Sequence, residues 1–63
     1  MYKNIEKILF DKGLTPYRMC KDLNIPTSNI TGWRRGDCNP SLKNLKKIAN
    51  YLEVSIEDLL RGE

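Results

Sequence analysis

Small polar side chains and two arginines are concentrated in residues 27–35, which read Thr-Ser-Asn-Ile-Thr-Gly-Trp-Arg-Arg. Hydroxyl and amide groups donate to and accept from the edges of nucleic-acid bases, and arginine binds guanine or phosphate. Thr, Ser, Asn and Gly are weaker helix formers than Ala, Leu, Glu or Lys. A helix that needed only stability would not use them here. The segment therefore indicates a binding surface, and the alternative is an exposed helix of poor propensity.

Residues for other kinds of chemistry are scarce. The chain has no histidine and only two cysteines, Cys20 and Cys38, which cannot supply the usual four ligands of a zinc ion. No glycine-rich phosphate loop and no plausible pair of nucleophile and base is present, and the carboxylates are scattered. We therefore expect no catalytic residues, no metal, no cofactor and no small-molecule ligand. Both thiols are expected to stay free, as is usual in the reducing cytoplasm.

Positive charge lies in the middle of the chain. Residues 18–47 hold seven lysines and arginines against two acidic residues, whereas residues 48–63 hold one arginine against four acidic residues. This asymmetry favours one face that attracts polyanions. The longest apolar run, residues 8–10, is too short to span a membrane, and the start of the chain lacks the apolar segment of a signal peptide. The sequence thus predicts a cytoplasmic protein with no membrane contact.

Five short helices are expected to position the polar segment. Apolar residues recur at helical spacing from Tyr2 to Leu9, and Gly13 ends that pattern. Thr15 and Pro16 form an N-cap and a first helical turn, and this second helix runs to about residue 23. Asn24 suits the left-handed conformation of a turn. The third helix opens at residue 26 or 27 and closes at residue 36.

The remaining helices follow a turn at residues 36–40. Ser41 caps a fourth helix whose apolar residues 42, 45, 48, 49 and 52 form one face. Ser55 and Asp58 resemble a capping box that starts a fifth helix. No segment alternates with the period of a strand. The fold class is therefore all-α, a compact bundle of five short helices in a single domain over residues 1–63, with a helix-turn-helix at about residues 15–36.

At this point the chain resembles the phage-repressor, or Xre/Cro-type, helix-turn-helix domains, which have the lambda-repressor-like fold. The matching segments are "KGLTPYRMCKDLNI", "ITGWRRG", "NPSLKNLKKIANYLEVS" and "IEDLL", which lie within residues 4–60. The resemblance implies that residues 27–35 form the recognition helix and enter the major groove of DNA. Such a domain is expected to bind double-stranded DNA at an operator.

The resemblance also assigns the residues that would contact DNA. The positions that would read bases are Thr27, Ser28, Thr31 and Gly32. Glycine offers no side chain, so it implies either a close backbone approach or a base pair left unread. The positions that would hold the DNA backbone or support the contact are Tyr17, Arg18, Asn29, Arg34, Arg35, Asn39 and Lys43. Pro16 stands where relatives often have a glutamine that contacts phosphate, and Tyr17 or Arg18 is expected to compensate.

One pair of positions departs from the family pattern. Many relatives carry an arginine at the position of Leu9 and a glutamate at the position of Arg34, and these form an ion pair between the first and third helices. Both have changed here. We expect Leu9 to contact the aliphatic stem of Arg34 and the guanidinium to be free for solvent, for Asp11 or for a phosphate. On this hypothesis Arg34→Glu weakens DNA binding far more than folding.

The function that follows is that of a bacterial or phage transcriptional regulator, a repressor that binds a two-fold operator as a homodimer. The alternative is a protein-interaction module, such as an antitoxin or an anti-repressor partner, with secondary DNA binding. Apolar residues near the end of the chain bear on that choice, because they either form a two-fold interface or close the core: Val54, Ile56, Leu59 and Leu60.

Overall fold

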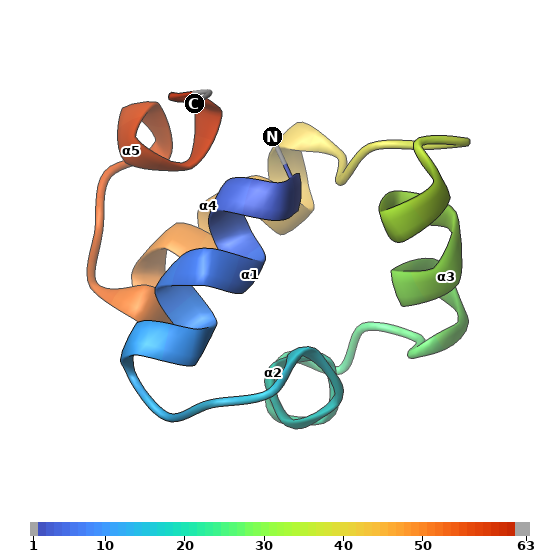
Figure 1. Cartoon of the computed structure of the whole chain (residues 1–63), viewed down its shortest axis with the longest axis horizontal. Coiled ribbons are helices and arrows are strands. Elements are labelled where there is room, and N and C mark those ends of the chain that lie inside the picture. Colours follow the sequence, from blue (N-terminus) through green and yellow to red (C-terminus); the bar gives the residue numbers. More distant parts are fainter. Residues whose placement is uncertain (1, 62–63) are drawn as a thin grey trace.

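Five helices account for most of the chain. The structure, a computed structural model, describes residues 2–61. Its helices are α1 (Tyr2–Asp11), α2 (Pro16–Leu23), α3 (Ser28–Arg35), α4 (Leu42–Leu52) and α5 (Ile56–Leu60) (Figure 1). The described residues contain no strand, so the prediction of an all-α bundle is confirmed.

The helix starts follow from side chains that accept hydrogen bonds from free backbone N–H groups. The Thr15 hydroxyl accepts from the N–H of Arg18 at 3.1 Å, and Pro16 occupies the first turn of α2. The Ser41 hydroxyl caps α4 in the same way. Ser55 and Asp58 bond to each other's backbone N–H at 3.1 and 3.2 Å, which completes the capping box of α5. All three caps are as predicted.

Left-handed residues end the helices. Asn24, at the end of α2, has φ 61°, as predicted, and Gly36 follows α3 with φ 80°. Glu53 ends α4 with φ 59°, in a conformation that residues other than glycine and asparagine rarely adopt. Nothing in the local sequence predicted that conformation at a glutamate.

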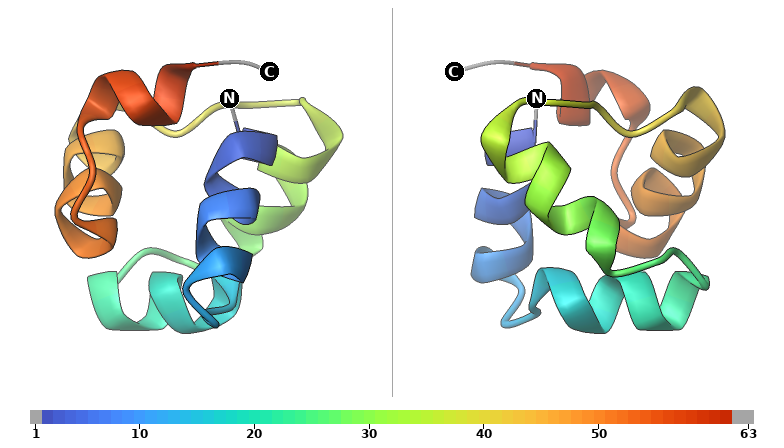
Figure 2. Two further views of the ribbon diagram at one scale, coloured as in Figure 1. Left: turned by 60° about the vertical axis from the view of Figure 1, so that its left-hand side comes forward. Right: turned by 90° about the vertical axis from the view of Figure 1, so that its right-hand side faces the viewer.

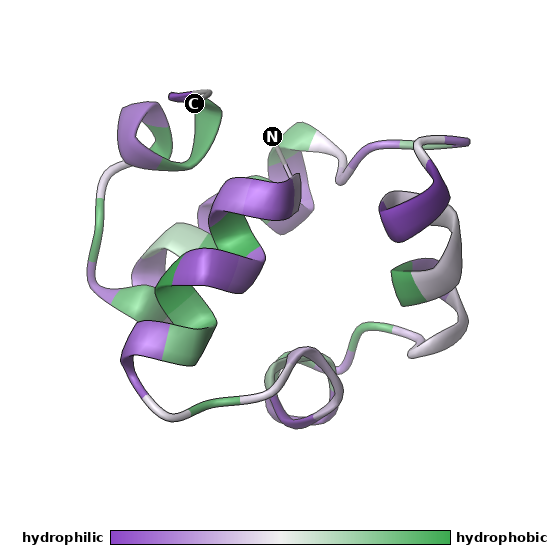
Figure 3. Cartoon of the chain, in the orientation of Figure 1, coloured by the Kyte–Doolittle hydropathy of each residue, from purple (hydrophilic) through white to green (hydrophobic). Residues whose placement is uncertain are grey.

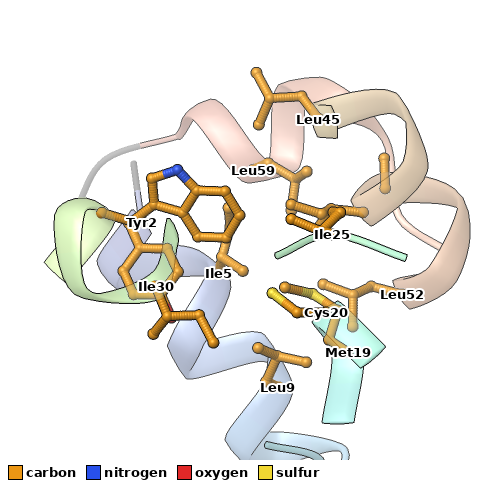
Figure 4. Close-up of a cluster of buried hydrophobic side chains, with 13 residues drawn as sticks. Tyr2, Ile5, Leu9, Met19, Cys20, Ile25, Ile30, Leu45, Leu52 and Leu59 are labelled. Atoms are coloured by element: carbon orange, nitrogen blue, oxygen red, sulfur yellow. The ribbon is translucent and has the colours of Figure 1, made fainter. Parts of the chain in front are cut away.

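The core lies where α1, α2, α4 and α5 converge, and α3 contributes two residues to it. Ile5, Leu9, Met19 and Cys20 are fully buried among these helices (Figure 4). From α3, Ile30 is fully buried and Trp33 is 5% exposed. The Trp33 ring lies 5.6 Å from the ring of Tyr2 on α1, a tilted aromatic pair.

Helix α3 is attached to the bundle along one side. The principal contacts between elements are α1 with α3 and α5, and α4 with α2 and α5. Turning the molecule so that α3 faces the viewer shows α1 and α2 flanking it (Figure 2). Coloured by hydropathy, α3 is mostly white and purple, whereas α1 and α4 carry clear green faces (Figure 3). The surface of α3 that faces away from α1 is therefore available for another molecule.

Three of the four apolar residues near the end of the chain belong to the core. Leu59 is fully buried, and Val54 and Ile56 are half-buried and pack against the core cluster. Leu60 is 49% exposed. Only Leu60 of this group is left to extend an interface with another chain.

Candidate nucleic-acid interface

The turn between α2 and α3 sets the angle of the second helix. The N–H of Ile25 donates to the carbonyl of Cys20 at 2.9 Å, across the left-handed Asn24, and the Ile25 side chain is buried. The next turn begins at once, because the N–H of Asn29 donates to the carbonyl of Pro26 at 3.1 Å. A short helix, a tight turn and a second short helix thus form a helix-turn-helix unit.

The outer face of α3 carries exposed hydroxyl groups. Thr27, Ser28 and Thr31 are exposed, and Thr27 makes no side-chain cap bond although it stands at the N-cap. Within residues 2–61 none of these three hydroxyls takes part in a side-chain hydrogen bond. Asn29 is half-buried on the flank of the helix. These hydroxyls have donor and acceptor capacity that the fold does not use.

Gly32 has a packing reason to be glycine. A Cβ atom built on Gly32 would lie 2.7 Å from the Sγ atom of Cys38. The N–H groups of Asp37 and Cys38 both donate to the carbonyl of Gly32, at 3.0 and 3.4 Å. The loop after α3 therefore folds back against this position, and the missing side chain is directed at that loop. The sequence could not show this contact, and base reading at Gly32 stays a prediction.

Arg34 forms an ion pair that the sequence analysis missed. Its Nε atom lies 2.7 Å from the Oε2 atom of Glu6 on α1, and its guanidinium lies 6.0 Å from the centre of the Tyr17 ring. The hydrogen bond from Arg34 to Glu6 raises the pKa of Arg34 further. The expectation that this guanidinium has no partner on α1, or pairs with Asp11, is therefore wrong, whereas its contact with a phosphate stays a prediction, because the side chain is still 49% exposed. The link between α1 and α3 is kept, with the acid on α1.

Arg18 is also paired. Its Nε atom lies 3.3 Å from the Oδ2 atom of Asp22, and the Tyr51 hydroxyl donates to the same oxygen at 2.6 Å. The hydrogen bond from Tyr51 is the main cause that lowers the pKa of Asp22, and Arg18 adds to it. Asp22 thereby joins α2 to α4. Of the basic side chains predicted near DNA, Arg18 and Arg34 are thus held by acids.

Among the basic residues predicted to contact DNA, Arg35 and Lys43 form no ion pair within residues 2–61. Both are exposed. Asn39, in the loop between them, is exposed as well. Tyr17 is 52% exposed at the start of α2. Exposed cations with a neighbouring amide suit contacts to phosphate, which fix register without reading sequence.

The two cysteines occupy different surroundings. Cys20 is buried and Cys38 is exposed, and both are free thiols. Burial raises the pKa of the Cys20 thiol, which keeps it protonated. In the described part of the chain, no cluster of His, Cys, Asp and Glu is able to hold a metal ion, and no helix is long and apolar enough to cross a membrane.

This helix-turn-helix unit exposes the polar face of its second helix, and basic residues lie around that face. Both features are typical of a DNA-binding domain. A family model described as the Cro/C1-type HTH DNA-binding domain matches residues 4–62. The chain belongs to this family, as the sequence predicted. It is a DNA-binding domain of the kind used in transcription regulation, and not an enzyme.

Curated relatives carry matching names. An uncharacterized HTH-type transcriptional regulator of Haemophilus influenzae is 42% identical over 55 residues, which are 87% of this chain and 23% of that protein. The HTH-type transcriptional regulator YqaE of Bacillus subtilis, also named as uncharacterized, is 36% identical over 97% of this chain and 53% of its own length. The HTH-type transcriptional activator BcrR of Enterococcus faecalis is 28% identical over 97% of this chain and 30% of its length.

The chain therefore spans between about a quarter and about half of the length of these relatives. No solved structure gives a significant match to it.

Proposed function

We propose that this chain reads double-stranded DNA with α3 in the major groove, as the operator-binding part of a transcriptional regulator. The observation that carries the proposal is the outer face of α3, where the hydroxyls of Ser28 and Thr31 are exposed and unused by the fold. Arg35 stands at the end of the same face. Hydroxyls that read base edges and an arginine that binds guanine or phosphate are the chemistry of major-groove recognition.

A two-fold arrangement of two copies fits the dimensions of the domain. Half-sites lie about one helical turn apart, roughly 34–36 Å, whereas the domain measures 23 × 22 × 21 Å. Two abutting copies reach that spacing only when each α3 lies on the side away from its neighbour. Helices α3 and α5 lie on opposite sides of the molecule (Figure 1). We therefore place the homodimer contact near α5, with the exposed Leu60 in it.

We propose that the outcome of binding is repression. Repression requires only that the bound domain covers promoter DNA, whereas activation requires a further contact with the transcription machinery. The relative BcrR is named an activator, so activation is the alternative. A reporter downstream of the operator separates them, because expression falls when the chain represses and rises when it activates. A regulator of this kind acts on chromosomal DNA, which places it in the cytoplasm.

Substitutions on two parts of the interface test the major-groove assignment. Ser28→Ala and Thr31→Ala each remove a hydroxyl from the outer face of α3, and each is expected to relax base preference at one position of a half-site. Lys43→Gln removes a predicted phosphate contact, and it is expected to weaken binding to all sequences alike and to reduce the salt dependence. The matched control is Thr15→Ser, which keeps the α2 cap and leaves base preference unchanged. Equal effects of the α3 variants on all sequences would refute the assignment.

An interaction module remains the second candidate because of one exposed side chain. Phe10 on α1 is 82% exposed, and it lines a shallow hollow of about 250 Å³ with Leu14 and Pro16. An exposed aromatic residue next to a hollow is typical of protein contacts. If Phe10→Ser abolishes regulation in cells and leaves DNA binding intact, a protein partner acts at this edge.

A further inference from the structure

A hollow of the described surface lies between α1 and α3. It has a volume of about 510 Å³, and its walls come from two segments that are distant in sequence, α1 and the end of α3 with the loop that follows it. Tyr2 and Lys3 contribute from the first turn of α1, Arg35 from the last turn of α3, and Asn39 from the following loop. The first turn of α1 lies beside that loop in both views of Figure 2. Helix α1 therefore adds a wall to the DNA-binding surface that the sequence analysis did not assign.

The charges of this hollow suit an anion. Lys3 and Arg35 are exposed, and within residues 2–61 neither takes part in an ion pair. The acid of the hollow, Glu6, is already bonded to Arg34 at 2.7 Å. Two uncompensated cations and the amide of Asn39 thus surround the opening. A phosphate group needs this combination of positive charge and hydrogen-bond donors.

We infer that the hollow between α1 and α3 seats a backbone phosphate of the operator, held by Lys3 and Arg35 with the Asn39 amide as a further donor. The inference rests on the proposed function, because DNA reaches the hollow only when α3 lies in the major groove. The hollow includes the last turn of α3, so the phosphates that border the groove pass beside it. Lys3 then contacts the phosphate directly and fixes the register of the domain without reading a base.

Lys3→Gln tests the inference through the salt dependence of DNA binding. Lys3 is exposed, so the variant is expected to fold as the wild type does. The slope of log K against log salt is expected to fall by about 0.9 for each bound copy, which is the loss of one phosphate contact. Affinity at about 0.1 M salt then falls roughly eightfold per copy, and the loss shrinks as salt rises. The loss is the same for operator and unrelated duplexes.

Lys12→Gln is the matched control, because Lys12 is exposed and lies outside the hollow, beyond the far end of α1. Nine residues of helical rise put the two lysines about 13 Å apart, more than the screening length of roughly 10 Å at 0.1 M salt. Equal slopes for the wild type and Lys3→Gln overturn the inference and leave the proposed function standing. Absence of any DNA binding by the wild type overturns both.

A further arm tests the source of the phosphate. Inorganic phosphate, added at constant ionic strength, is expected to leave the difference between wild type and Lys3→Gln intact. If phosphate abolishes that difference, the hollow takes a free phosphorylated molecule, and the assignment to DNA is overturned.

Discussion

Gly32 offers a direct test of why a poor helix former stands in the middle of α3. Glycine in a helix interior costs about 1 kcal/mol relative to alanine. The structure names one obstacle to alanine, the Sγ atom of Cys38 at 2.7 Å from the position of the added Cβ atom. No other atom from outside the local helix lies within 4 Å of that position. The loop side chain therefore decides whether the gain from alanine is realised.

The expected free energies follow from these two effects. In the wild-type background, Gly32→Ala gains about 1 kcal/mol of helix propensity and loses about 0.5–1.5 kcal/mol as Cys38 is forced aside, so stability changes little. In a Cys38→Ala background the obstacle is absent and the full gain of about 1 kcal/mol appears. For a domain of 60–100 residues that gain raises the melting temperature by roughly 4–8 °C.

Thermal unfolding of the four proteins of this cycle, followed by circular dichroism, measures the coupling between the two positions. A coupling near zero, with Gly32→Ala equally harmful in both backgrounds, would refute the packing explanation. DNA binding of the doubly substituted protein separates the two roles of the glycine. The added methyl group points at the loop, so operator preference is expected to be retained. A selective loss of DNA affinity would instead mean that the Gly32 backbone approaches the DNA.

Three other substitutions test contacts outside the outer face of α3. Ser55→Ala removes the α5 capping box and is expected to cost about 1 kcal/mol in urea unfolding, and no shift in midpoint would exclude a role for the cap. Arg34→Glu is expected to lower the melting temperature, because it places a second carboxylate beside Glu6. The double variant Glu6→Arg and Arg34→Glu is expected to restore it. If the double variant is not restored, the ion pair between residues 6 and 34 does not join α1 to α3. The folded-state pKa of Asp22 is lowered from 3.8, so its contribution is present above that pH and is lost as pH falls through the folded value. Urea midpoints of the wild type are therefore expected to fall more steeply than those of Asp22→Asn as the pH is lowered through 3.8 and below. Parallel curves would contradict this.

Local signals in the sequence were enough to predict the helices. Thr15 with Pro16, Ser41, and Ser55 with Asp58 each act within one helical turn, so their pattern is visible in a few consecutive residues. The apolar periodicity likewise identified the buried faces, because burial repeats with the helical period. The exception is Leu42 in the first turn of α4, which was predicted on the apolar face and is 62% exposed. The exposed hydroxyls of α3 were predicted on the same basis.

Contacts between distant residues were not visible in the sequence. Arg34 and Glu6 are 28 positions apart, and Tyr51 and Asp22 are 29 apart. Nothing in the spacing says which acid an arginine will meet once α1 and α3 are packed. The resemblance to the family predicted that the ion pair between these helices is lost. The structure instead forms one between Arg34 and Glu6, which lies about one turn before Leu9 on α1. The hollow beside Lys3 depends on the same packing, and for that reason it was missed.

Selection of bound duplexes from a random DNA pool, at low and at near-physiological salt, measures whether α3 reads sequence. A palindromic consensus that survives the higher salt is expected, with half-sites about one helical turn apart. Its sharpest positions should relax in the Ser28→Ala and Thr31→Ala variants. Binding that is blind to sequence, and that disappears at the higher salt, would contradict the reading of DNA by α3.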